Sequence, residues 1–264
     1  MKLRHATNAG MMDCKHALQE AEGDFDKAVD IIRKRGLIVA SKRADREAKE
    51  GCVLARAEGK KAALVSLNCE TDFVAKNENF VKFTQSILDT AFTNMPADLN
   101  ALLALQIDGR SISDQIAEQT GVIGEKLELS FYGKVEGEDT VAYIHPGNKL
   151  ATIVAFNKTA DAQVKKDVAM QAAAMAPIAV DKTDVPENVI AHELEIGKEK
   201  AREEGKPENM LEKIAQGRLN KFFQESTLLN QAFVKEPKET VKTYMQSHDK
   251  DLTVTSFVRF TLND

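Results

Sequence analysis

A strand-like run and a helical run meet at Asn68-Cys69-Glu70-Thr71-Asp72-Phe73-Val74-Ala75-Lys76-Asn77. Residues 62–67, before this corner, form an apolar run typical of a strand. Residues 79–92, after it, carry their large apolar side chains on one helical face. A corner between a strand and a helix normally carries small polar residues, because the backbone turns there and its tip faces water. The adjacent pair Phe73 and Val74 breaks that rule.

The side chain of Phe73 has two interpretations at this stage. It folds back onto the following helix as a hydrophobic cap, or it points outward beside Asp72 as a wedge for a partner. An exposed phenylalanine gives up about 1.5–3 kcal/mol of burial, so an outward ring needs a functional reason.

Composition indicates an ordinary globular protein with an acidic surface. The chain has 264 residues, of which 43% are hydrophobic, and a net charge of −5. This length allows a core in more than one domain. The acidic balance argues against direct binding of nucleic acid, which requires a basic field. We expect no membrane attachment, because no apolar run approaches the ~20 residues of a membrane span, and the first residues do not resemble a signal peptide.

The cysteines and the missing motifs argue against an enzyme. Cys14, Cys52 and Cys69 lie far apart without a CxxC pair, so we expect reduced thiols in a cytoplasmic protein. There is no phosphate-binding GxxxxGKS/T loop, no HExxH metal spacing and no nucleophile elbow. We therefore expect no cofactor, no bound metal and no catalytic residues. A hydrolase that uses Cys69 or Cys14 stays open as an alternative.

Residues 1–46 predict a small helical domain, here called the head, that ends in a linker. Three short helices separated by glycine turns indicate a bundle like a ubiquitin-associated domain, with the third helix stopping at Gly36. Met11 and Met12 either fill the core of this bundle or form a soft contact surface for a partner. The charged residues 37–50 predict a solvated linker with some helix.

An internal repeat follows the head. Residues 47–135 form the first copy, and residues 136–180 with 227–264 form the second. Each copy predicts a hairpin, a helix, a second helix and a closing strand, so we expect an α+β fold with antiparallel sheets and helices on one face. The first copy uses eleven residues at its corner, 69–79, where the second uses six, 158–163. The second copy completes the same fold without the additional residues, so folding does not need them. This favours the interpretation in which the ring of Phe73 points outward.

The repeat also predicts where the individual elements lie. They are expected at residues 52–57, 62–67, 79–92, 112–119 and 127–132 in the first copy, and at residues 141–144, 150–156, 162–175, 239–246 and 252–260 in the second.

An insertion at residues 181–226, here called the arm, interrupts the second copy. Two narrow apolar stripes at helical spacing flank the turn Gly205-Lys206-Pro207. This pattern predicts an antiparallel coiled coil with charged outer faces. Such an arm touches little of its own domain, so it either contacts a partner or a second copy of the chain, or it is a solvated decoration.

Two stretches resemble the signatures of the translation elongation factor Ts family. They are Leu3-Arg4-His5-Ala6-Thr7-Asn8-Ala9-Gly10-Met11-Met12-Asp13-Cys14-Lys15-His16-Ala17-Leu18 and Asn68-Cys69-Glu70-Thr71-Asp72-Phe73-Val74-Ala75-Lys76. The order of head, duplicated core and arm is also similar to that family. The chain departs from the pattern of that family at three points. Asn8 replaces a usual Gly, the first helix is reduced to its last turn, and no C-terminal helical module follows Phe260 as in some members.

The resemblance implies a guanine-nucleotide exchange factor for elongation factor Tu, which it would bind both with GDP and without nucleotide. By this similarity, the segment that acts on the partner consists of Thr71, Asp72, Phe73 and Val74. These residues would dislocate Mg²⁺ from the GTPase domain of the partner, so that GDP leaves.

The resemblance also implies docking surfaces elsewhere in the chain. Arg4, Met11 and Met12 would bind the same GTPase domain, and His145, at the tip of a turn, is a further candidate contact. The second half of the core and the arm would reach other domains of the partner, or a second copy in a homodimer. The alternative function is a non-enzymatic adaptor whose head recruits a different client.

Overall fold

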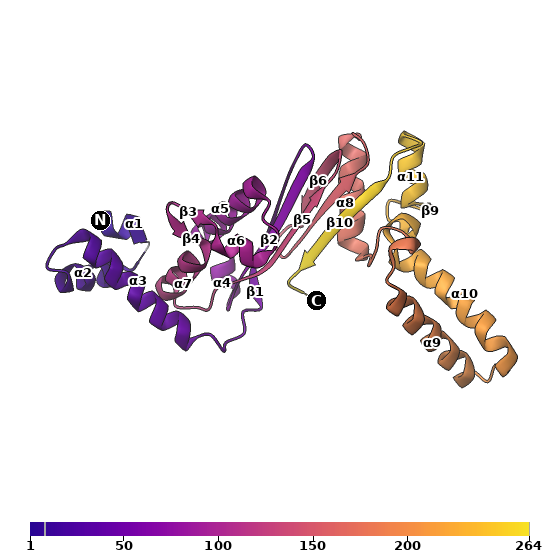
Figure 1. Cartoon of the computed structure of the whole chain (residues 1–264), viewed down its shortest axis with the longest axis horizontal. Helices are drawn as coiled ribbons and strands as arrows, with labels where there is room; N and C mark the ends of the chain where they lie inside the picture. The colour runs from indigo at the N-terminus through magenta and orange to yellow at the C-terminus, as the bar shows by residue number, and fades with distance from the viewer. Residues whose placement is uncertain (8, 264) are drawn as a thin grey trace.

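The structure of the chain, a computed structural model, describes residues 1–7 and 9–263. Asn8, one of the three departures from the family pattern, lies outside the described residues. The molecule is elongated, with the head at one end, the core in the middle and the arm projecting from the other end (Figure 1). In the residues so described, no helix is long and apolar enough to cross a membrane.

The head consists of helices α1 (Lys2–Thr7), α2 (Met11–Glu20) and α3 (Phe25–Lys42). Asp24 starts α3, because its carboxylate accepts a hydrogen bond from the backbone N–H of Lys27 at 3.0 Å. The buried side chains between the helices are mostly small, and they are Leu3, Ala9, Cys14, Ala17, Ala21, Ala28 and Ile32. Small side chains let these short helices approach closely and form a core of limited volume.

The prediction that the third helix stops at Gly36 was wrong. Helix α3 continues to Lys42, and it packs against helix α7 (Ile112–Ile123) of the core. Gly36 faces Gly121 at this crossing, where a Cβ on Gly121 would lie 2.0 Å from the Cα of Gly36. The two glycines therefore serve a close approach of two backbones rather than a helix end. Residues 37–42, the first part of the expected linker, therefore belong to α3.

The core contains two three-stranded antiparallel sheets with equivalent strand orders, β1-β2-β5 and β10-β7-β6. In each sheet the second strand of the hairpin is central, and the closing strand pairs with it. This arrangement confirms the predicted α+β fold with a duplicated core. The strands are β1 (Glu50–Glu58), β2 (Lys61–Cys69), β5 (Glu128–Glu136), β6 (Asp139–Ile144), β7 (Leu150–Phe156) and β10 (Val254–Thr261).

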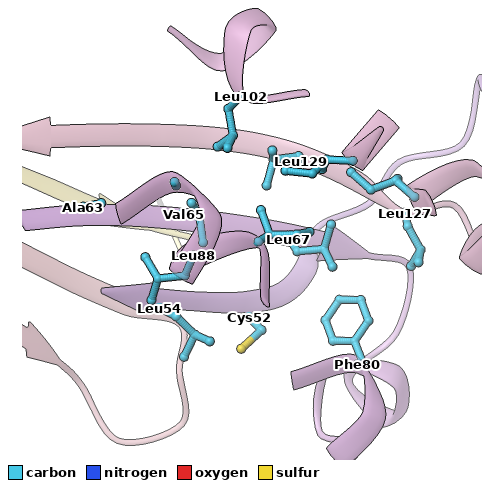
Figure 2. Packing of buried hydrophobic residues seen from close by; sticks show 14 of the residues in the cluster. Cys52, Leu54, Ala63, Val65, Leu67, Phe80, Leu88, Leu102, Leu127 and Leu129 are labelled. Atoms are coloured by element: carbon cyan, nitrogen blue, oxygen red, sulfur yellow. The ribbon is translucent and has the colours of Figure 1, made fainter. Parts of the chain in front are cut away.

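Helices cover the outer face of each sheet, as predicted. Helices α5 (Glu78–Asn94) and α6 (Leu99–Ala104) join α7 on the first sheet. Helices α8 (Ala162–Met175) and α11 (Val241–His248) cover the second. Figure 2 shows the first of these cores, in which leucine side chains of the strands lie close to helix side chains such as Phe80 and Leu88.

The inner faces of the two sheets pack against each other, which the sequence did not predict. On β1, Cys52 and Leu54 face the helices while Val53, between them, faces the other sheet. Phe131 and Phe260, one from each sheet, stack with ring centroids 4.4 Å apart. The central strands are therefore buried on both faces and read as continuous apolar runs.

The arm consists of the antiparallel helices α9 (Glu187–Glu203) and α10 (Glu208–Ser226). Its seam is narrow, since a Cβ on Gly197 would lie 3.1 Å from the Cα of Ala215. Ion pairs between the helices cover the outside, including Lys198 with Glu212 at 2.7 Å. These observations confirm the predicted coiled coil.

Several short elements were not predicted from the sequence. They are α4 (Asp72–Ala75), α6 (Leu99–Ala104), β3 (Gln106–Ile107), β4 (Arg110–Ser111), β8 (Ala232–Phe233), β9 (Glu236–Thr240) and the 3₁₀ turns η1 (Lys182–Asp184) and η2 (Leu228–Asn230). Such elements are too short for a hydrophobic period to reveal them.

The glycine crossing between head and core can be tested by adding one methyl group. We expect Gly121→Ala to lower the free energy of unfolding by about 1–3 kcal/mol, because the new Cβ overlaps the backbone of α3. Gly217→Ala in α10 is the matched control, since a Cβ there meets nothing within 4 Å, and it should gain up to about 1 kcal/mol from helix propensity. Urea unfolding followed by circular dichroism measures both changes, and equal stabilities of the two variants would contradict the crossing.

The arm can be removed to test whether the core folds without it. Deleting residues 190–222 and closing the gap with a short Gly-Ser linker should leave the core folded, because α9 and α10 bury their apolar seams mainly against each other. Thermal unfolding followed by circular dichroism should keep one cooperative transition for the core. Loss of that transition would mean that the arm is part of the core.

Candidate functional site

Phe73 lies on α4, the single helical turn between β2 and α5. Its side chain is 84% exposed to solvent, so the ring does not cap the following helix. Its neighbours Val74 and Ala75 are partly buried and pack against the core of the first copy. One side of α4 therefore anchors the turn, while the aromatic ring points away from the protein.

The charge beside the ring belongs to Asp72, in the first turn of α4. The ammonium group of Lys76, one turn later, donates a hydrogen bond to Asp72 Oδ2 at 2.6 Å. This bond, and the positive charge of Lys76, lower the pKa of the Asp72 carboxyl. Asp72 is thus an ionised carboxylate at neutral pH, directly next to an exposed aromatic ring.

Contacts outside α4 hold this corner in place. Thr71 precedes the helix, but its side chain makes no capping bond to it. Instead the Thr71 hydroxyl donates to the carboxylate of Glu125, in the loop after α7, at 2.6 Å. Sequence reasoning missed Glu125, because no local pattern connects two residues that lie 54 positions apart.

A hollow of about 380 Å³ lies directly beside the ring. Its apolar wall includes Phe80 and Phe83 from α5 and Ile123 from the end of α7, with Phe73 itself at one side. The exposed ring and the hollow together form an exposed, partly apolar surface, of the kind that marks interaction sites.

The head presents a second apolar surface. Met11 and Met12 are 68% and 57% exposed, so they do not fill the core of the bundle. Arg4 and Met11 line a hollow of about 480 Å³ together with Lys15. The structure therefore brings Arg4 and Met11 together, and Met12 lies next to them at the start of α2. This surface lies on the head, apart from α4 (Figure 1).

His145 lies exposed in the turn between β6 and β7, as expected. The Tyr143 hydroxyl and His145 Nδ1 are 2.9 Å apart. The same turn approaches α4, since the charge of Lys149 contributes to the lowered pKa of Asp72 after that of Lys76. Lys149 Nζ also pairs with Glu50 Oε2 at 2.8 Å. The fold thus brings a turn of the second copy towards the corner of the first.

The cysteines lie inside the protein. Cys14, Cys52 and Cys69 are all buried. Desolvation is the main cause that raises the pKa of Cys69 to about 12 and that of Cys52 to about 11. Such thiols carry almost no thiolate at neutral pH, which disfavours the hydrolase alternative for Cys69. Among the residues that the structure describes, no group of three or more His, Cys, Asp or Glu side chains is placed to hold a metal ion.

Comparison with known proteins gives a consistent result over the whole chain. The family model described as elongation factor TS matches residues 70–264. The chain is 54% identical to an elongation factor Ts of Porphyromonas gingivalis over 263 residues, covering 99% of this chain and 96% of the relative. The chain belongs to the elongation factor Ts family. It is also 52% identical to the elongation factor Ts of Azobacteroides pseudotrichonymphae and 50% identical to that of Amoebophilus asiaticus, covering at least 98% of this chain and 95% of each relative.

Membership of the elongation factor Ts family confirms the resemblance carried by the two signature stretches. It identifies the chain as a translation elongation factor. The roles of Thr71, Asp72, Phe73 and Val74, and of Arg4, Met11, Met12 and His145, stay predictions about how such a factor acts.

Proposed function

We propose that this chain is the guanine-nucleotide exchange factor for elongation factor Tu. It binds elongation factor Tu that carries GDP, dislocates Mg²⁺ and promotes release of GDP, so that GTP can bind in its place. The observation that carries this proposal is the 84% exposed ring of Phe73 beside the ionised Asp72. Leaving that ring in water gives up about 1.5–3 kcal/mol of burial, which a partner that covers the ring would recover.

The chemistry of nucleotide-bound Mg²⁺ makes such a wedge effective. A Mg²⁺ ion in a nucleotide site is held by one or two protein ligands together with phosphate oxygens and water, in a demanding octahedral geometry. Phe73 acts as the wedge, Thr71 and Val74 hold it at the corner, and Asp72 adds a negative charge next to it. A small displacement of the partner's ligands releases the ion, and the diphosphate then loses the charge that compensated it.

Exchange by this route is a coupling between two ligands of the same partner. The factor weakens the binding of GDP, and GDP must weaken the binding of the factor by the same ratio. No covalent bond changes in the process, so the chain acts as a binding protein rather than as an enzyme. The nucleotide-free complex is the state in which the factor binds most tightly.

Separate surfaces of the chain bind different parts of the partner. The exposed Arg4, Met11 and Met12 of the head bind the same GTPase domain on which Phe73 acts. His145 adds a contact from the turn beside α4. The arm and the second half of the core reach the remaining domains of the partner, or a second copy of this chain in a homodimer.

This division corresponds to the domain assignment that we propose. The assignment comprises the head (1–46), an N subdomain of the core (47–135), a C subdomain (136–180 and 227–264) and the arm (181–226). A factor of this kind acts in the cytoplasm, where its partner works in translation, and its net charge of −5 gives it no electrostatic attraction to nucleic acid.

The role of Phe73 can be tested by removing its ring. Phe73→Ala should keep the far-ultraviolet ellipticity of the parent, because the ring is exposed and packs little within the chain. The rate of GDP release from elongation factor Tu should fall by about 30-fold, because a central aromatic anchor contributes about 2 kcal/mol or more. Stopped-flow fluorescence with labelled GDP measures this rate.

Ile38→Ala is the control, since Ile38 is 54% exposed on α3 and has no assigned docking role. It should exchange like the parent. Unchanged GDP release by Phe73→Ala would remove Phe73 from the mechanism. An adaptor that uses only its head would also be unaffected by the loss of this ring, so that outcome would favour the alternative function.

A further inference from the structure

Helix α4 cannot fix the direction of Phe73 by itself. It contains four residues, from Asp72 to Ala75, and the side chain of Thr71 makes no capping bond at its start. Helical segments of this length are unstable in water without tertiary contacts, because nucleating a single turn is unfavourable. The pose of the ring must therefore be imposed by groups outside the helix.

The carboxylate of Glu125 makes three hydrogen bonds to the residues that begin this corner. Its Oε2 accepts from the backbone N–H of Glu70 at 3.1 Å and from that of Thr71 at 3.0 Å. Its Oε1 accepts from the Thr71 hydroxyl at 2.6 Å. Hydrogen bonds to an ionised acceptor are about twice as strong as neutral ones. One side chain thus fixes both the backbone and the side chain of the residue that precedes α4.

Glu70, at the corner, in turn accepts a hydrogen bond from the loop that carries Glu125. Its Oε1 accepts from the backbone N–H of Lys126 at 2.6 Å, so each segment gives a carboxylate to the amides of the other. Arg43 and Arg46, which follow α3, bind the Glu70 carboxylate at 2.8 and 3.1 Å. Burial alone would raise the pKa of Glu70, but these donors outweigh it and lower the pKa.

We propose that Glu125 is a positioning residue for Phe73. Its carboxylate holds the corner between β2 and α4 in the conformation that presents the ring to solvent. Without it, the ring moves into the apolar hollow of about 380 Å³ that it borders, against Phe80 and Phe83. This role of Glu125 rests on the proposed function of Phe73, and it can be measured with and without elongation factor Tu.

The first measurement needs no partner. The chain contains no tryptophan, so Phe73→Trp places a single indole at the site. In that variant the emission should be typical of a solvent-exposed indole, and the decay of its anisotropy should follow the tumbling of the whole protein. Adding Glu125→Ala should shift the emission to shorter wavelength and add a fast component to the anisotropy decay.

Conservative and control substitutions separate positioning from a general loss of structure. Glu125→Gln keeps one oxygen for the two amides and an N–H₂ group that can donate to the Thr71 hydroxyl, so it should restore both signals. Glu128→Ala removes an exposed carboxylate from the neighbouring strand, where it pairs with Lys126 at 3.2 Å, and it should behave like the parent. If Glu125→Ala lowers the thermal midpoint of unfolding sharply, Thr71→Val removes the hydroxyl bond alone and should change the indole anisotropy in the same direction.

The second measurement uses the chain with its native Phe73. Glu125→Ala should slow the release of GDP from elongation factor Tu by about tenfold, less than the loss of the ring itself, because the ring is still present but is no longer held by the three hydrogen bonds of this carboxylate. Glu125→Gln should restore the rate. Unchanged emission and anisotropy of the indole at position 73 in Glu125→Ala would overturn the positioning role. A changed indole signal with unchanged GDP release would support that role and overturn the exchange function of Phe73 instead.

Discussion

Keeping the Phe73 ring in water costs the free protein about 1.5–3 kcal/mol of lost burial, and the surrounding structure prevents the ring from recovering it. An apolar hollow borders the ring directly. The ring stays outside because α4 is tethered on both sides, by the partly buried Val74 within the helix and by Glu125 before it. On the proposed function, the free energy of burying this ring is left for the partner to supply. Glu125, Thr71 and the partly buried Val74 hold the corner from which this side chain projects.

The contacts that surround α4 continue to the head. Gly36 and Gly121 allow two helix backbones to touch, and Arg33 on the same helix pairs with Asp114 at 3.1 Å. Arg43 and Arg46 then join the end of α3 to Glu70, immediately before the corner. The exposed surface of the head and the exposed ring are consequently parts of one framework. A partner that contacts both loses less entropy on binding than it would with two independently moving modules.

The sequence predicted those parts of the molecule that repeat a hydrophobic period over many residues. The two hairpins, the long helices α5 and α8 and the coiled coil of the arm fall into this class. It failed where tertiary contacts override the local signal. Glycine at position 36 usually ends a helix, yet here it serves a crossing with a residue 85 positions away. Nothing in the local pattern could reveal that the two sheets pack together, or that Glu125 binds Thr71. Phe73 could be singled out from the sequence because an aromatic residue is unusual at a corner between a strand and a helix. Glu125, which holds the corner, is an ordinary residue for a loop, so the local sequence gives no sign of its role.

In the proposed function, the exposed corner acts on the partner through its Mg²⁺ ion. The most direct test measures the rate of GDP release from elongation factor Tu with and without the intact chain, first in the presence of Mg²⁺ and then after chelation. If the chain works by displacing the ion, it should accelerate release strongly in Mg²⁺ and by a much smaller factor once the ion is already gone. The same acceleration in both conditions would contradict displacement of the Mg²⁺ ion as the route to GDP release.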